Sequence, residues 1–367
     1  MNGVLYQLTQ PNFYKFWLRY LNRLLILKAA PRVIGPRDRI CGYEIDPPHV
    51  PDEPLEDFIR QAIQEQGLQA QTQEILTFLD YWLPIQVLGV AGRVAIEFLV
   101  TTNRPCLGMM LYGRNDRIEP AFGDFCRLID QHSPTVDACC EICRCFSDSD
   151  VAMVRSEFQP GMPARYSIAS SWHLDILRGH GCLQRCMERL PSGFDSLGLI
   201  DAARSVSALL APDFYPLHFG MSFGGDGALE PKLYLIRFDR KRSPLYRGST
   251  LWRFIERMGV SATSLEQIKM VNSQLWGHSL DKMTQIGIEL SETTMVPRRI
   301  NLIYGSVPTN AIRLVIDQLD HPASSLETVD NFERILKSYC AKYVAMRVTP
   351  EGISKRIKLY EHAVFKI

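Results

Sequence analysis

Basic side chains recur with a fixed spacing on segments that alternate like β-strands. Lys232 and Tyr234 alternate with leucines, and Lys358 and Tyr360 repeat the arrangement near the end of the chain. Alternate residues of a strand share one face, so each pair points away from the apolar side chains. The same reasoning places three further cations on that face, the first with the least regular alternation: Arg165, Arg299 and Arg356.

Cations gathered on one face require an anion. A single basic residue on a strand is usually a solvated group at the rim of a sheet. Repetition in equivalent strands instead indicates a shared centre, and several cations are stable there only when a bound anion neutralises them. A diphosphate is such an anion, and tyrosine hydroxyls would supply further hydrogen-bond donors to it.

Glu97 is an acid within an otherwise apolar strand-like run. Ile96 and Phe98 belong to the apolar face, so Glu97 points to the opposite side. A partly buried carboxylate there could activate a bound nucleophile and accept its proton. The alternative is a carboxylate that faces solvent or pairs with Arg93.

Five β-hairpins must position these side chains. Each is predicted from two β-branched or apolar runs separated by Pro, Gly or Asn. The paired runs are 93–101 with 105–112, 151–158 with 164–170, 217–223 with 232–238, 285–291 with 299–304, and 342–348 with 356–365. Their nearly regular spacing indicates one supersecondary unit used five times.

Helical segments separate the hairpins, as the spacing of Leu251, Phe254 and Ile255 illustrates. The predicted fold is therefore α+β, a ten-stranded antiparallel β-barrel of five ααββ repeats with α-helices outside. Ten strands enclose a space wider than side chains fill, so the barrel would hold a ligand chamber. Residues 1–50 are predicted to form an N-terminal helical extension and residues 51–367 a single barrel domain. Two unrelated α+β domains are the alternative.

Composition excludes some function classes. Lys and Arg total 41 and Asp and Glu total 40, so the net charge of +1 does not favour general nucleic-acid binding. The segment 13–30 is too short and too charged for a membrane span, and residues 1–10 lack the order of a secretory leader. Ten cysteines without such a leader favour reduced thiols in the cytoplasm.

Three short motifs resemble the aromatic prenyltransferases of the ααββ (ABBA) barrel family, which includes dimethylallyltryptophan synthases and cyanobacterial peptide and indole prenyltransferases. They are Ile96-Glu97-Phe98, Pro231-Lys232-Leu233-Tyr234-Leu235 and Arg356-Ile357-Lys358-Leu359-Tyr360. The resemblance implies transfer of an isoprenyl group from its diphosphate, such as dimethylallyl or geranyl diphosphate, to an indole or a peptide aromatic side chain. A non-catalytic barrel that binds a hydrophobic ligand or peptide is the alternative.

The resemblance also implies roles for individual residues. Glu97 resembles the acid that hydrogen-bonds the acceptor and helps remove its proton. The diphosphate set would be Arg165, Lys232, Tyr234, Arg299, Asn301, Arg356, Lys358 and Tyr360. Leu107, Met109 and His218 would line the prenyl and acceptor pocket. Two departures concern the diphosphate set: residues 107–111 carry no cation, and Asn301 stands where a lysine or another donor is expected.

The implied co-substrate is an isoprenyl diphosphate. The sequence contains no Asp-Asp-x-x-Asp motif, so the aspartate-rich metal site of the α-helical prenyl synthases is missing. Mg²⁺ could still bind through the diphosphate oxygens, because it commonly uses substrate phosphates and few protein ligands.

Cys139, Cys140, Cys143 and Cys145 form the main competing motif. Zinc would need a second, separated pair of ligands, which Cys182 and Cys186 could supply. The alternative is a set of buried core thiols. The run 224–227 lacks the order of a phosphate-binding loop and is predicted to be a hairpin turn.

Overall fold

The computed structural model describes most of the chain after residue 54. The described residues are 55–85, 93–100, 106–129, 136, 137, 140, 141, 151–171, 199–210, 214–223, 229–238, 250–279, 283–290, 297, 299–336 and 338–364. The predicted N-terminal extension, residues 1–50, lies outside them. So do Cys139, Cys143, Cys145, Cys182 and Cys186 of the proposed zinc motif. No helix in the described ranges has both the length and the apolar character that a membrane crossing requires.

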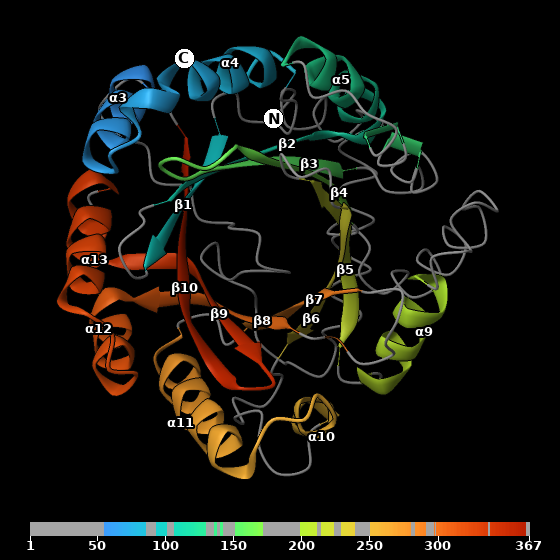
Figure 1. Cartoon of the computed structure of the whole chain (residues 1–367), viewed down its shortest axis with the longest axis vertical. Helices are drawn as coiled ribbons and strands as arrows, with labels where there is room; N and C mark the ends of the chain where they lie inside the picture. Colours follow the sequence, from blue (N-terminus) through green and yellow to red (C-terminus); the bar gives the residue numbers. More distant parts are fainter. Residues whose placement is uncertain are drawn as a thin grey trace, which may run out of the picture.

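Ten antiparallel strands form one closed barrel (Figure 1). They are β1 (Arg93–Val100), β2 (Leu107–Arg114), β3 (Val151–Phe158), β4 (Arg165–Ser171), β5 (Tyr215–Phe223), β6 (Leu229–Phe238), β7 (Met283–Glu289), β8 (Ile300–Pro308), β9 (Cys340–Thr349) and β10 (Gly352–Val364). Pairing of β1 with β10, from Arg93 opposite Val364 to Val100 opposite Ile357, closes the sheet. The predicted barrel is therefore confirmed, and the interpretation as two unrelated domains is wrong.

Helices surround the strands on the outside (Figure 1). They are α3 (Leu55–Glu65), the short 3₁₀ helix η1 (Gln69–Gln71), α4 (Thr72–Trp82), α5 (Asn115–Leu128), α9 (Leu199–Leu210), α10 (Thr250–Arg257), α11 (Ala262–His278), α12 (Thr309–Gln318) and α13 (Ala323–Leu336). The main core lies between these helices and the outer face of the barrel. Phe98 of β1, for example, packs edge-on against Phe332 of α13, with ring centroids 5.7 Å apart. Burial of this apolar layer holds the helices on the sheet.

The alternation of the strands separates this core from the interior. Leu233, Leu235 and Leu359 are fully buried in the outer core. Lys232, Tyr234, Lys358 and Tyr360 alternate with them and line the interior. The strand pattern thus places a charged and aromatic set inside the barrel, as the sequence predicts.

Two interior glycines make room for larger neighbours across the strands. A Cβ atom on Gly108 would lie 2.8 Å from the Cβ of Glu97, and one on Gly287 would lie 2.7 Å from Cε1 of Tyr234. Gly108 pairs with Glu97 on one side and Glu157 on the other. Its missing side chain allows these two carboxylates to approach each other.

Candidate active site

The barrel encloses a chamber with two connected parts. One part, of about 580 Å³, is lined mainly by charged residues near the hairpin turns. The other, of about 770 Å³, is lined by Met110, Met153, Ala169, Ile303 and His218, among others. Seven residues line both parts: Arg155, Ser167, Ser222, Lys232, Tyr234, Ile303 and Tyr360. A charged region therefore opens directly into a largely apolar one.

Strands β1, β3 and β10 contribute an ion-pair network that we term the buried cluster: Glu97, Arg155, Glu157, Arg356 and Lys358. The Nη2 atom of Arg155 lies 2.7 Å from the Glu97 carboxylate and 2.6 Å from that of Glu157. Lys358 Nζ lies 2.6 Å from Glu97 and 2.8 Å from Glu157. Arg356 completes the network with a 3.2 Å contact to Glu157. Each carboxylate is thus held by at least two cations.

Electrostatic pairing outweighs burial within this cluster. Burial by itself would raise the pKa of Glu157, but Lys358 and Arg155 hold that pKa well below its ordinary value. Burial by itself would lower the pKa of Arg155, but Glu97 and Glu157 raise it well above its ordinary value. Glu157 and Arg155 therefore remain charged over the whole physiological pH range.

A second network, the rim cluster, lies where strands β4, β6, β7 and β8 meet their hairpin turns. It comprises Arg165, Glu230, Lys232, Glu289 and Arg299. Glu230 pairs with Arg165, lies 3.2 Å from Lys232 Nζ and lies 3.1 Å from Arg299 Nη2. Arg299 also pairs with Glu289.

Within the rim cluster, the pKa of Lys232 is strongly lowered. Burial, together with Arg155, Arg165 and Lys358, lowers the pKa of Lys232 to about 7, although Glu230 opposes the shift. Burial by itself would raise the pKa of Glu230. The neighbouring cations Lys232, Arg165 and Arg299 outweigh burial and lower that pKa to about 2. The proton of Lys232 is therefore weakly held near neutral pH.

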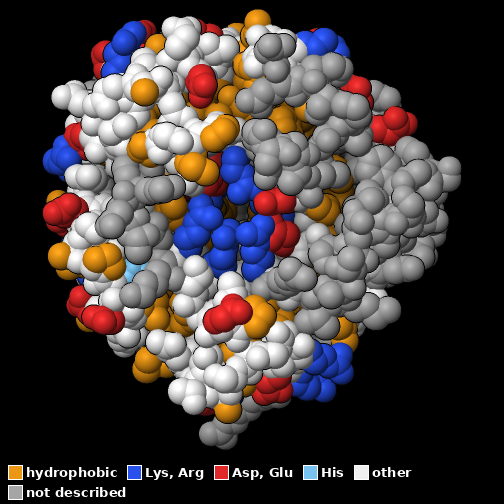
Figure 2. All heavy atoms as spheres, viewed as in Figure 1, with side chains coloured by type: hydrophobic (Ala, Val, Ile, Leu, Met, Phe, Trp, Pro, Cys, Tyr) orange, Lys and Arg blue, Asp and Glu red, His pale blue; other side chains and the backbone are white. Residues whose placement is uncertain are grey.

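Arg347 adds a further cation between the two clusters. It lines the charged part, and burial together with Arg356 and Arg299 lowers its pKa to about 10. The charged groups described in and around the chamber are then seven cations (Arg155, Arg165, Lys232, Arg299, Arg347, Arg356, Lys358) and four carboxylates (Glu97, Glu157, Glu230, Glu289). Figure 2 shows Lys and Arg side chains gathered in the hollow at the centre of the barrel. This excess of positive charge makes the chamber a site for an anion.

Two partly buried tyrosines, Tyr234 and Tyr360, line both the charged part and the apolar part. Burial raises the pKa of Tyr234 and, more strongly, that of Tyr360. Their hydroxyls therefore remain protonated and can donate hydrogen bonds. His218 packs edge-on against Tyr234, with ring centroids 5.8 Å apart, and burial lowers its pKa to about 3. The apolar side of the chamber thus contains a neutral histidine.

Most of the predicted residues come together in this chamber. Its lining includes Arg165, Lys232, Tyr234, Asn301, Arg356, Lys358, Tyr360 and His218. Arg299 joins the rim cluster through its ion pairs. Glu97 is 1% exposed and lies behind Arg155 and Lys358 rather than on the chamber wall. Its direct contact with an acceptor stays a prediction.

Leu107 and Met109 are the exceptions. Both lie in the outer core, and Met110 lines the chamber instead. The placement of Leu107 and Met109 in the pocket was wrong because Glu97 pairs with Gly108, which fixes the even-numbered residues of β2 as the inward set.

Five charged residues in and around the chamber were missed by the sequence reasoning: Arg155, Glu157, Glu230, Glu289 and Arg347. It considered cations on the second strand of each hairpin, whereas Arg155, Glu157 and Arg347 lie on first strands. The available signal was an Arg-x-Glu pair, 155 and 157, within an apolar strand, where charged residues are uncommon.

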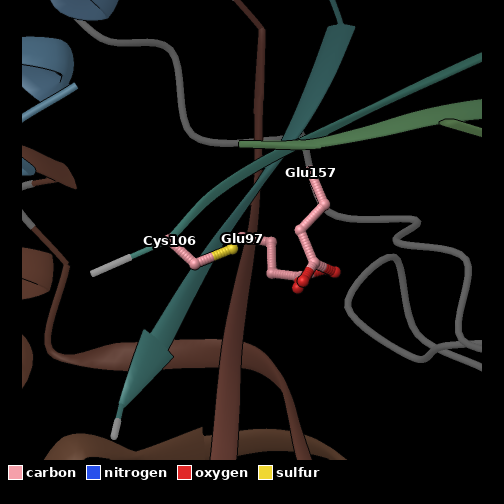
Figure 3. Close-up of side chains that lie close together, drawn as sticks. All are labelled: Glu97, Cys106 and Glu157. Carbon is pink, nitrogen blue, oxygen red and sulfur yellow. The ribbon is translucent and has the colours of Figure 1, made fainter. Parts of the chain in front are cut away.

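Figure 3 shows Glu97, Cys106 and Glu157 converging, with their ligand atoms within 4.8 Å of one another. These are atom types that could hold a metal ion. However, Arg155 and Lys358 already contact both carboxylates. Burial, Glu157 and Glu97 also raise the pKa of the Cys106 thiol well above its ordinary value. The thiol therefore stays protonated, and the adjacent cations disfavour a metal there.

Comparison with known proteins identifies the fold. No family model matches the amino-acid sequence, and no curated protein matches it significantly. Among solved structures, AnaPT from Neosartorya fischeri has a TM-score of 0.60 and 12% identity, over 85% of this chain and 92% of that one. The 6-dimethylallyltryptophan synthase from Micromonospora olivasterospora, in complex with DMASPP and Trp, has a TM-score of 0.61 and 12% identity, over 84% and 95%. PriB with product diphosphate has a TM-score of 0.56 and 14% identity, over 84% and 96%. The chain therefore has the ααββ prenyltransferase-barrel fold.

Proposed function

We propose that the protein is an aromatic prenyltransferase. It would bind an isoprenyl diphosphate in the charged part of the chamber and transfer the isoprenyl group to an electron-rich aromatic acceptor, such as an indole or a peptide aromatic side chain, in the apolar part. The observation that carries this proposal is the excess of cations in and around the chamber, directly beside an apolar wall and joined to it by Tyr234 and Tyr360.

The cation excess matches the charge of the donor. A fully ionised diphosphate ester carries about three negative charges, since its terminal phosphate has a last pKa near ~6. Seven cations against four carboxylates leave an equal and opposite surplus among the described residues. Lys232, Arg347, Arg356 and Lys358 line this part and would contact the phosphate oxygens.

The chemistry has three steps. The bond between C1 of the donor and the diphosphate oxygen breaks, and both electrons leave with diphosphate. The preorganised cations stabilise the leaving group, and the faces of Tyr234 and Tyr360 stabilise the allylic cation. An aromatic carbon of the acceptor then forms a bond to C1.

The last step is loss of the proton from that aromatic carbon. Arg155 and Lys358 hold Glu97 and Glu157, so the diphosphate product is the available base. The products are the prenylated acceptor and protonated diphosphate. The apolar wall formed by Met110, Met153 and Ile303 would exclude the water that otherwise captures the cation.

The chamber residues do not fit a magnesium site of their own. Mg²⁺ prefers free carboxylate and water oxygens. Lys or Arg side chains engage each of Glu97, Glu157, Glu230 and Glu289. Basic side chains would therefore neutralise the diphosphate.

The test is incubation of the protein with dimethylallyl or geranyl diphosphate and a panel of indoles, phenols and aromatic peptides, with products read by mass spectrometry. A mass increase of one isoprenyl unit together with diphosphate release is expected. A barrel that only binds a hydrophobic ligand would bind the acceptor without releasing diphosphate. Failure to bind a non-hydrolysable donor analogue would reject the proposal.

A further inference from the structure

Arg155 has an unused donor at the junction of the two parts of the chamber. Its contacts to Glu97 and Glu157 both use Nη2. The Arg155 side chain is 15% exposed and lines both parts. Because only one of its nitrogens is engaged by the two carboxylates, the guanidinium has donors left for an oxygen of a bound molecule.

The apolar part offers no counter-ion to an acceptor that carries a positive charge. Its described lining contains no Asp or Glu. The nearest carboxylates, Glu97 and Glu157, are held by Arg155 and Lys358. An ammonium group transferred there from water would lose its hydration without gaining a counter-ion, which costs several kcal/mol.

The cations around the apolar part also disfavour a positively charged acceptor. Lys232 and Arg155 line the apolar part as well as the charged one. A cationic acceptor would face both, whereas an oxygen-bearing acceptor would be attracted by both.

We infer that the acceptor is an aromatic compound that bears a hydrogen-bond-accepting oxygen, as a carboxylate, phenol or carbonyl, and carries no ammonium group, with Arg155 as the residue that selects it. This inference rests on the proposed function, because it assigns the apolar part of the chamber to the acceptor.

The experiment compares matched acceptors of opposite charge. Indole-3-propionate and tryptamine share a ring and differ in end-group charge, as do 3-(4-hydroxyphenyl)propionate and tyramine. Binding of each is measured at pH 7 to the full chain saturated with dimethylallyl S-thiolodiphosphate. Within each pair of acceptors, the carboxylate compound is expected to bind at least tenfold more tightly than the amine. Equal binding, tighter amine binding or no binding by all four would overturn the inference.

Two variants test whether Arg155 is the residue that selects the acceptor. Arg155→Gln should reduce the carboxylate-to-amine preference at least tenfold, because it removes the donor and leaves Glu97 and Glu157 with one cation fewer. Arg165→Gln is the matched control, since Arg165 lines only the charged part and should leave the preference unchanged. An unchanged preference in Arg155→Gln would assign selection to another residue and overturn the role of Arg155.

Binding of the donor analogue separates this inference from the proposed function. If the analogue binds and the preference is absent, only the acceptor inference fails. If the analogue does not bind to the wild-type chain, the proposed function fails and the inference fails with it.

Discussion

The buried cluster and the rim cluster have the same composition and different surroundings. Each contains three cations and two carboxylates. In the buried cluster, the Glu97 and Glu157 side chains are 2% and 7% exposed. In the rim cluster, the Glu230 and Glu289 side chains are 22% and 17% exposed. Water screens the rim pairs, so identical charges should contribute less there.

The largest expected difference concerns stability. Glu157→Gln removes the shared partner of Arg155, Arg356 and Lys358, and should lower the free energy of unfolding by about 3–5 kcal/mol. Glu230→Gln is the matched rim variant and should cost about 1 kcal/mol. Urea unfolding of both variants measures the difference. Similar losses would show that the two clusters are equally screened.

Donor binding should show the next largest difference. Lys358→Met removes a charge-assisted contact worth about 1.5–3 kcal/mol, so affinity for a diphosphate analogue should fall about 10–100-fold. Arg165→Met should lower it only about threefold, because its charge is more exposed. Titration calorimetry at fixed ionic strength measures both. A larger loss in Arg165→Met would place the diphosphate at the rim cluster.

His218 shows what burial does to a titratable group when desolvation dominates. Its folded-state pKa is about 3, and its unfolded value is 6.5. Below pH 6.5 the unfolded chain binds a proton that the folded chain does not, so stability falls as pH decreases from 6.5 toward 3. At pH 5 this loss should reach about 2 kcal/mol relative to pH 7.5.

The matched variant for this effect is His218→Gln, which has no titrating ring. Its free energy of unfolding should fall less than that of the wild-type chain between pH 7.5 and pH 5, by about the same 2 kcal/mol. Parallel pH profiles for the two proteins would contradict the assignment to His218.

The smallest expected effect is a pH dependence of donor binding that arises from Lys232. It is charged below its folded-state pKa of about 7, and a bound diphosphate would raise that pKa. Above pH 7, donor binding therefore requires uptake of a proton, and affinity should fall up to tenfold per pH unit. Lys232→Arg keeps its charge and should remove this slope. An equal slope in both proteins would assign the proton to another group.

Much of the fold could be predicted because it follows from local patterns. Alternation in residues 231–235 and 356–360 determined which side chains face inward, and turn residues placed the hairpins. The assignment of Leu107 and Met109 failed because both strand faces there are apolar, so the pattern did not show which one faces the helices. Pairing of Gly108 with Glu97 decided it.

The sequence by itself determined that cations and tyrosines would lie on one face of repeated strands, because strand alternation is a local property. Only the tertiary structure decided which charges meet. The pairing of Arg155 with Glu97, 58 positions apart, depends on the register of three adjacent strands. Closure of the barrel by β1 and β10 brought Lys358 to the same carboxylate. Registers between distant segments are set by the packing of the whole barrel, which no local pattern specifies.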